Sequence, residues 1–168
     1  LLTIHSDYLE IDPKTKAIAQ AEEIRKGLMK FGECIVTFIA AEKGDEDNPE
    51  KVIGDAKKEI ESVAEQLGCK QIVLYPYVHL TQNPGQPSLA RDLLLKIEES
   101  FRGSNYKVAH APFGWYKAFK IAAKGHPLSE LSRQINSKGV PSGKSAKDDD
   151  VISGALKSEE TLKSHWHI

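Results

Sequence analysis

Cysteine is scarce in this sequence, and long apolar runs are missing. The two cysteines, Cys34 and Cys69, lie far apart and form no CxxC pair, so the sequence predicts neither a disulfide framework nor a zinc ribbon and favours a reducing, intracellular compartment. No apolar stretch approaches the roughly 20 residues that a membrane-spanning helix needs, and no signal peptide opens the chain. We therefore expect a cytoplasmic protein that has no membrane partner.

The motifs of several large enzyme classes are also missing. There is no Walker sequence, no GxGxxG and no GxSxG, so phosphoryl transfer, nicotinamide chemistry and serine hydrolase catalysis lose their usual support. The six histidines show neither an HExxH motif nor paired-cysteine spacing, so the sequence predicts no metal site. No cofactor is expected either.

The chain carries little net charge, and its charges are unevenly distributed. The formal value of −1 at pH 7 argues against a global basic field for nucleic acid. Residues 115–147 nevertheless hold seven Lys or Arg against a single acid, Glu130, whereas residues 42–62 hold eight acids against four lysines. The basic segment could meet a phosphate backbone through a few salt-sensitive contacts, or it could be a solvated lysine face. Both interpretations stay open.

The chain of 168 residues is long enough for one domain with a real core and a tail. The elements expected in the first part are a strand at 1–8, a turn at 11–13, a short helix at 22–31 and a strand at 33–42. The last of these is almost continuously apolar, as a strand covered on both faces requires. A long helix then begins with Asn48 as N-cap and Pro49 at its first position, and it ends at Gly68.

The second part of the chain continues the alternation. Its expected elements are a strand at 70–79, a helix at 88–101, strands at 106–111 and 115–123, and a helix at 127–135. Strands separated by helices need crossover connections, so we expect an α/β fold whose sheet is partly parallel. Because the composition turns small, polar and charged near residue 138, the predicted organisation is a folded domain at 1–138, a linker at 139–157 and a further segment at 158–168.

Two side chains near predicted strand ends are candidates for chemistry. His79 follows a buried strand, where open α/β sheets bind ligands, and it could orient a water or simply close a loop by hydrogen bonding. Alternation along 115–123 places Lys117 on the apolar face and Tyr116 on the other. A lysine on such a face either extends past its neighbours to solvent or points into a pocket.

A Gly125-His126-Pro127 corner precedes the last expected helix. The free N–H groups of a helix N-terminus favour an anion, so this corner could contact one. Glu130, at the third helical position, could be a capping-box acid or reach toward the pocket.

Several blocks of sequence resemble the N-terminal editing domain of archaeal-type threonyl-tRNA synthetase. They are Ile4-His-Ser-Asp-Tyr8, Ala41-Glu-Lys43 followed by Asn48-Pro49, Tyr75-Pro-Tyr-Val-His-Leu80, Ala111-Pro-Phe-Gly-Trp-Tyr-Lys-Ala-Phe-Lys120 and Gly125-His-Pro-Leu-Ser-Glu-Leu-Ser-Arg133. The resemblance covers residues 1–138, and residues 158–168 are similar to the segment that leads into the synthetase body. It implies a fold related to D-aminoacyl-tRNA deacylases, with three layers and helices packed on a two-sheet β core, and usually a homodimer.

The resemblance also implies an activity, which is hydrolysis of L-serine mischarged on tRNA(Thr). The residues that it assigns to catalysis are Lys117, His79, Tyr116 and Glu130, and those that it assigns to substrate binding are Ala41, Val78, Phe113 and His126. Lys117 would orient the substrate and the attacking water, and a ribose hydroxyl of the terminal adenosine would share the work. Trp115 stands where relatives commonly have tyrosine, which changes the bulk beside Lys117.

Two other functions fit the same resemblance. One is a free-standing deacylase that clears D-amino acids from tRNA generally. The other is a non-catalytic module that binds tRNA or dimerises as part of a synthetase.

Overall fold

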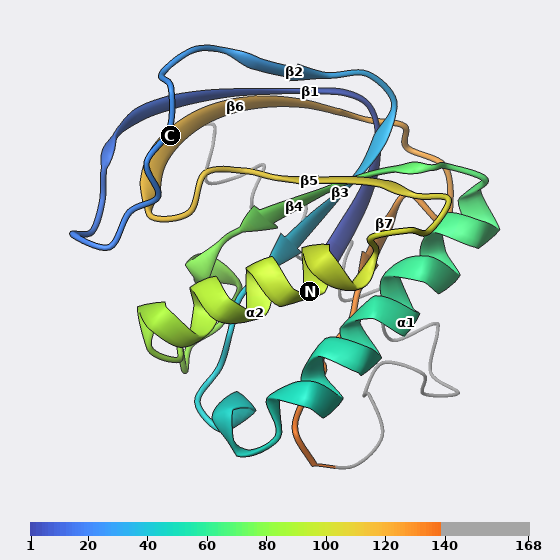
Figure 1. The fold of residues 1–168 in the computed structure, drawn as a ribbon. Helices are drawn as coiled ribbons and strands as arrows, with labels where there is room; N and C mark the ends of the chain where they lie inside the picture. The colour runs from blue at the N-terminus through green and yellow to red at the C-terminus, as the bar shows by residue number, and fades with distance from the viewer. Residues whose placement is uncertain (139–168) are drawn as a thin grey trace.

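Strands and helices alternate in the computed structural model, which describes residues 1–138 (Figure 1). In chain order the elements are β1 (Leu2–Lys16), β2 (Met29–Phe31), β3 (Cys34–Ile39), η1 (Asp45–Asp47), α1 (Pro49–Leu67), β4 (Gln71–Pro76), η2 (Val78–Leu80), α2 (Pro87–Ser100), β5 (Lys107–His110), β6 (Trp115–Ala123) and β7 (Glu130–Ser132). The predicted α/β class is therefore confirmed. The predicted linker at 139–157 and the segment at 158–168 lie outside the described residues. No helix among the described residues is long and apolar enough to cross a membrane.

The strands form one mixed sheet of seven strands. Its main path runs β2-β1-β3-β4-β5, and β6 and β7 also pair with β1. The pairs β3–β4 and β4–β5 are parallel, whereas every pairing of β1 is antiparallel. The helices α1 and α2 make the crossovers between the parallel strands, as the alternating pattern predicts.

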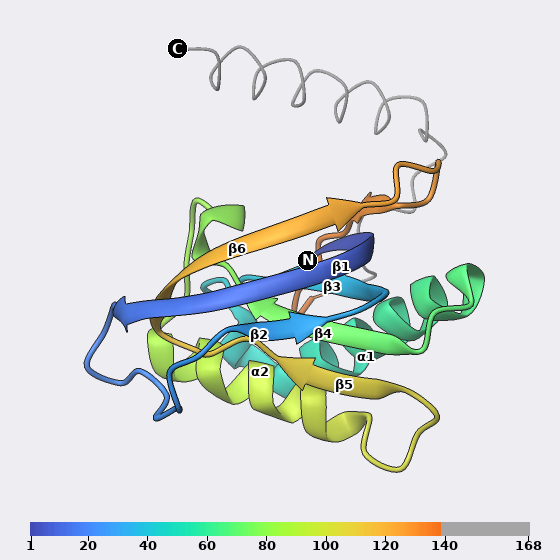
Figure 2. The same cartoon turned by 90° about the horizontal axis from the view of Figure 1, so that it is seen from above.

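The long strand β1 serves two parts of the sheet. Its first half pairs with β3 and β7, and its second half pairs with β2 and β6, with register shifts after Ser6 and after Pro13. These irregularities let the strand curl, so the outer antiparallel strands arch over the parallel ones (Figures 1 and 2). The expected turn at 11–13 is wrong, because Ile11 and Pro13 both pair with β6.

The core lies on both faces of the parallel strands. On one face, α1 and α2 pack against β3 and β4 through a cluster that includes Ile60, Ile72 and Leu94, all at most 1% exposed. On the other face, Leu9 and Ile11 of the curled strand β1 pack on β3 and β4 and are fully buried. Full burial of each such side chain stabilises the fold by about 1.5–3 kcal/mol. The chain thus has three layers: helices, parallel strands and curled antiparallel strands.

The helix α1 is placed as its sequence signals predict. The Asn48 side chain accepts a hydrogen bond from the Lys51 N–H at 3.3 Å, and Pro49 occupies the first turn. Gly68 ends the helix with φ 63°, a left-handed conformation that glycine adopts without steric cost.

Two predicted helices are wrong. Residues 22–28 form no regular element, and Met29–Phe31 is the strand β2; Glu22 instead bonds through its backbone to Phe113 and to the Trp115 indole. At 127–135 the chain forms β7, which pairs with residues 2–4 of β1. In both places the open edge of β1 offers backbone partners, and such tertiary pairing outweighs a weak local helix preference. There is consequently no helix N-terminus at Pro127 and no capping box at Glu130.

Candidate active site

A cavity of about 360 Å³ opens at the carboxyl ends of β3 and β4. Its walls come from residues 39–41, the 75–79 segment, α2 and the turn that begins β6 at 113–117. Most of the wall is apolar, and the volume lies within the roughly 300–1,000 Å³ of small-molecule sites. This edge of the sheet is where open α/β folds bind ligands.

Lys117 supplies the cation of the cavity wall. Its Nζ donates hydrogen bonds to the Pro112 carbonyl at 3.0 Å and the Trp115 carbonyl at 2.9 Å, and it lies 5.0 Å from the centre of the Tyr75 ring. Burial lowers the pKa of Lys117 from 10.5 to about 8, although the negative charge of Glu22 opposes this shift. Lys117 lines the cavity, carries a charge at neutral pH and loses it near pH 8.

His79 also lines the cavity. It follows β4 in the short helix η2, where its imidazole makes an edge contact with the Tyr77 ring at 5.2 Å between centroids. The residue is exposed, so its ring can reach both the cavity and water.

Four further predicted site residues also line the cavity. Ala41 and Phe113 are buried and form part of its floor, whereas Val78 and Tyr116 are 56% and 64% exposed and stand at its rim. Tyr116 alternates away from Lys117 along β6, so it reaches the cavity only at the opening.

Glu130 and His126 lie elsewhere. Glu130 is an exposed residue of β7 whose backbone pairs with Ile4, and it is not part of the cavity wall. His126 contacts His5, with 2.8 Å between its Nε2 and the His5 Nδ1. The structure thus brings six of the eight predicted residues to one cavity and places these two at a different part of β1.

The turn between β5 and β6 aims Lys117 into the cavity. Gly114 has φ 78°, and a Cβ at this position would lie 2.8 Å from the Ala21 Cα. Only glycine fits both the left-handed backbone and this close approach. The same turn is tied to Glu22, whose Oε1 accepts from the Phe113 N–H at 3.1 Å and whose carbonyl accepts from the Trp115 indole at 2.7 Å.

His110 holds Glu22 in place. Its Nε2 is 3.0 Å from the Glu22 carboxylate, and its Nδ1 bonds to Glu98 of α2. Burial acts to lower the pKa of His110, but the hydrogen bonds and charges of Glu22 and Glu98 outweigh it and raise this pKa above the ordinary value. The triad joins α2, β5 and the loop that supports Lys117.

Sequence patterns do not reveal Glu22, His110 or Tyr75 as parts of this site.

 Counted along the chain, Tyr75 precedes Lys117 by 42 residues and Glu22 precedes it by 95. Neither residue belongs to a local motif around Lys117, and no periodic signal could have found them.

The fold and the cavity define a class of protein: an α/β domain whose sheet edge holds a small-ligand pocket with an ammonium group and an imidazole on its walls. The family follows from comparison with known proteins. The model of the archaea-specific editing domain of threonyl-tRNA synthetase matches residues 1–135, and the chain belongs to this family.

Curated relatives agree with this assignment. The chain is 45% identical over 170 residues to a threonine–tRNA ligase of Thermococcus sibiricus and 46% identical over 175 residues to one of Methanococcoides burtonii, and both alignments cover the whole chain. A threonine–tRNA ligase of Methanococcus maripaludis is 51% identical over 135 residues, which are 80% of the chain and 21% of that relative. The chain spans about a quarter of the length of the first two relatives, 26% and 27%.

Proposed function

We propose that this domain is the proofreading unit of a threonyl-tRNA synthetase and hydrolyses L-serine mischarged on tRNA(Thr). The observation that carries the proposal is the Lys117 ammonium, which is held by two carbonyls and lines a largely apolar cavity. His79 lines the same cavity. An aminoacylation site that accepts threonine discriminates against serine only through one methyl group, which is worth about 1–3 kcal/mol of binding free energy. A second site that removes the error is therefore needed.

The proposed reaction is attack of water on the aminoacyl ester. The water oxygen bonds to the seryl carbonyl carbon, the ester bond to the ribose oxygen breaks, and the proton of the water passes to that oxygen. The neighbouring ribose hydroxyl of the terminal adenosine assists the transfer. Two of the three N–H groups of Lys117 bond to carbonyls, so the third would donate to the substrate. His79 and Tyr116 would orient the attacking water at the opening.

The cavity supports roles for six of the eight residues that the resemblance assigns. Ala41, Val78 and Phe113 would contact the seryl group, since all three line the cavity. Glu130 and His126 lie away from it in the described chain, so our mechanism gives them no catalytic step. No cofactor or metal is needed for this hydrolysis, because an ester is cleaved by water once the groups are positioned.

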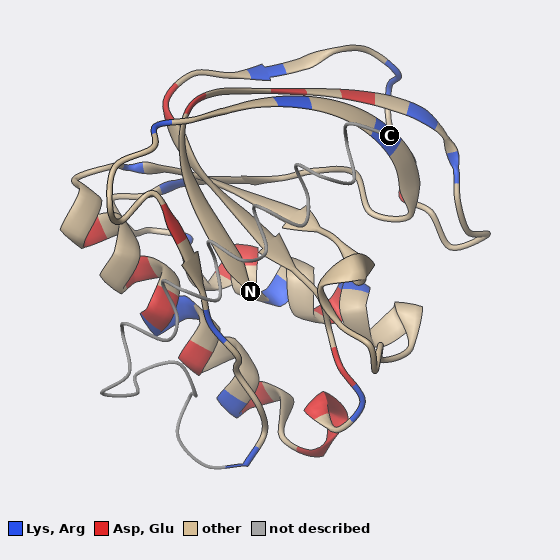
Figure 3. Ribbon diagram, turned by 180° about the vertical axis from the view of Figure 1, so that it is seen from behind, with Lys and Arg blue, Asp and Glu red and all other residues tan. Residues whose placement is uncertain are grey.

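The proposed partner is the acceptor end of tRNA(Thr), presented to the domain by the rest of the synthetase chain. Figure 3 shows many acidic residues along α1 and η1, and Lys and Arg interspersed with acidic residues along the outer antiparallel strands. A phosphate backbone would therefore approach from the strand side, through few contacts and with marked salt dependence. We further propose a fold related to D-aminoacyl-tRNA deacylases, a homodimer and a cytoplasmic location.

The test is deacylation of seryl-tRNA(Thr) by wild type, Lys117→Met and Lys120→Met. Lys117→Met keeps the bulk but removes the donor, so we expect turnover to fall about 10²–10³-fold, as when one oxyanion donor is removed. Lys120 is exposed on the other face of β6, so its variant is the matched control: at saturating seryl-tRNA it should keep the wild-type turnover, and loss of a phosphate contact would raise only KM. Circular dichroism checks that both variants fold.

Three outcomes would contradict the proposal. Unchanged turnover in Lys117→Met would make the lysine a structural residue. Rapid removal of D-tyrosine without action on L-serine would indicate a general D-aminoacyl-tRNA deacylase. A flat deacylation assay with intact tRNA binding would indicate a non-catalytic module.

A further inference from the structure

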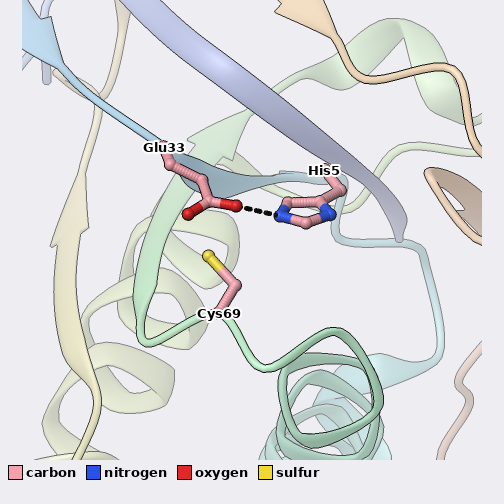
Figure 4. A group of neighbouring side chains, drawn as sticks. All are labelled: His5, Glu33 and Cys69. Atoms are coloured by element: carbon pink, nitrogen blue, oxygen red, sulfur yellow. Dashed lines mark hydrogen bonds and ion pairs between the residues drawn. The ribbon is translucent and has the colours of Figure 1, made fainter.

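A second group of reactive side chains meets at the opposite edge of the parallel strands. His5 of β1, Glu33 before β3 and Cys69 before β4 each offer one ligand atom, and these atoms all lie within 4.8 Å of one another (Figure 4). Glu33 and Cys69 precede their strands, whereas the cavity lies where β3 and β4 end. The cluster is therefore separate from the proposed active site.

The burial of this cluster is uneven. His5 and Cys69 are each 5% exposed, while the Glu33 side chain is 56% exposed. The Cys69 thiol makes one weak hydrogen bond, 3.6 Å from the Gln71 carbonyl oxygen. The cluster is thus closed toward the core and open to water on the Glu33 side.

We propose that His5, Glu33 and Cys69 bind a Zn²⁺ ion, with water in the fourth position. Imidazole nitrogen, thiolate and carboxylate are the ligands that zinc takes in proteins, and three protein ligands plus one water complete its tetrahedron. The residues are distant in sequence, so spacing motifs do not reveal them.

The present geometry needs only small side-chain movements to receive the ion. Zinc–ligand bonds of about 2.0–2.3 Å at tetrahedral angles place neighbouring ligand atoms about 3.3–3.7 Å apart. The His5 Nε2 and the Glu33 Oε2 are now 2.9 Å apart, so the carboxylate would move slightly outward. Cys69 would approach, since its sulfur lies within 4.8 Å of both.

The charges around the cluster can accommodate a divalent cation. The carboxylate and a thiolate together neutralise Zn²⁺. Lys124 lies 3.5 Å from the Glu33 Oε2, but its shorter contact is to Asp7, at 2.5 Å, and it keeps this partner when Glu33 turns to the ion. Burial raises the pKa of the Cys69 thiol, so zinc has to displace the thiol proton.

His126 would be the supporting contact behind the ligand His5. The Leu128 N–H donates to the His126 Nδ1 at 3.1 Å, so the His126 Nε2 carries the proton and donates to the His5 Nδ1. The other His5 nitrogen then donates to Glu33. With zinc on the His5 Nε2, the proton moves to Nδ1 and the direction of the His5–His126 bond reverses. The Leu128 N–H then bonds to water, which is available because this residue is 42% exposed.

Zinc in this place would act on stability. The ion would join β1, the segment before β3 and the turn after α1, of which a side-chain hydrogen bond now links His5 and Glu33. Because the unfolded chain lacks the assembled site, binding energy adds to the free energy of unfolding.

The experiment uses the 168-residue chain with Zn²⁺ and with Co²⁺ as a spectroscopic probe. We expect Co²⁺ to give a thiolate charge-transfer band in wild type and in Cys34→Ser but not in Cys69→Ser. Cys34 is the matched control, because it is also a buried free cysteine but lies outside the cluster. Zn²⁺ should raise the melting temperature of wild type and Cys34→Ser and leave His5→Gln and Cys69→Ser unchanged.

Binding should also depend on pH. Below the pKa of the thiol, zinc affinity should rise about tenfold per pH unit, because one thiol proton is released. In NMR spectra the His126 ring should change tautomer when zinc binds. The proposal is overturned if wild type gives no cobalt band, if the band survives Cys69→Ser, or if Zn²⁺ raises the melting temperature of His5→Gln as much as that of wild type.

Discussion

Lys117 shows how one side chain can be useful in a site and costly for the fold. Its ammonium is held by two carbonyls in a mostly apolar cavity, and burial lowers its pKa from 10.5 to about 8. A lowered lysine pKa means that the folded chain binds the proton less well than the unfolded chain. The charge needed at neutral pH is therefore maintained against the preference of the surrounding structure.

We predict that Lys117→Met stabilises the chain at pH 7 by about 0.5–2 kcal/mol while it slows deacylation. Below about pH 8 the wild-type lysine is charged in both states and its burial costs stability; between about 8 and 10.5 the unfolded chain binds more protons, so wild-type stability rises with pH. The advantage of the variant should shrink over this range. Urea unfolding at pH 7 and pH 9.5 measures it.

The control for this prediction is Lys120→Met, which removes a lysine from the exposed face of the same strand. Its effect on the free energy of unfolding should stay within about 0.5 kcal/mol. A destabilised Lys117→Met protein, or a gain that does not change with pH, would contradict the interpretation of Lys117 as a buried charge.

The turn from β5 into β6 positions the lysine, and one glycine makes this turn possible. Gly114→Ala places a Cβ 2.8 Å from the Ala21 Cα at a residue with φ 78°. We predict a loss of about 1–3 kcal/mol in the free energy of unfolding. Deacylation should slow as well, because Phe113 and Lys117 flank the shifted backbone.

Gly54→Ala is the matched substitution in α1. An added Cβ there meets no atom within 4 Å, and the residue lies inside the helix. Alanine is a better helix former, so this variant should gain about 0.5–1 kcal/mol. Thermal unfolding measures the stability of both variants. A Gly114→Ala protein that is as stable as wild type would show that the turn tolerates a side chain.

Elements with complete local signals could be predicted from the sequence. The helix α1 has its N-cap Asn48, an early Pro49 and the terminal Gly68, and each takes the predicted position. The strand β7 has no such signal, because its pairing depends on the distant edge of β1. The same edge explains why residues 29–31 form a strand where an apolar helical face predicts a helix.

The candidate site divides in the same way. Alternation along β6 places Lys117 beside Trp115 and Phe119, and all three line the cavity. Burial of the ammonium and its contact with the Tyr75 ring depend on packing between separate strands, so they could not be predicted. The proposed zinc site of His5, Glu33 and Cys69 could not be predicted for the same reason, since its residues come from three separate segments.

The assembled chain has a charged cluster that links its layers to the cavity. His110 of β5 bonds to Glu98 of α2 and to Glu22, and Glu22 holds the turn before Lys117. The cluster therefore connects a helix, a parallel strand and the loop after β1. A change in the charge of this cluster should alter both the free energy of unfolding and the geometry of the cavity.

Stability should consequently depend on the protonation of His110. Its folded pKa is raised, so its contribution is fully present below the unfolded value of 6.5 and is lost as the pH rises through the folded pKa. We predict that His110→Gln lowers the free energy of unfolding at pH 6 by about 1–3 kcal/mol, since it leaves two partly exposed carboxylates without their cation. Urea unfolding from pH 5 to pH 9 measures both effects.

The double variant Glu22→Gln/Glu98→Gln separates charge from packing. It removes both anions that raise the pKa of His110, so the part of the pH dependence that His110 contributes should disappear while the side chains keep their size. If wild type and the double variant show the same pH profile between 5 and 9, His110 is not the titrating group. If His110→Gln unfolds like wild type at pH 6, the cluster contributes nothing to holding the helix, the strand and the loop together.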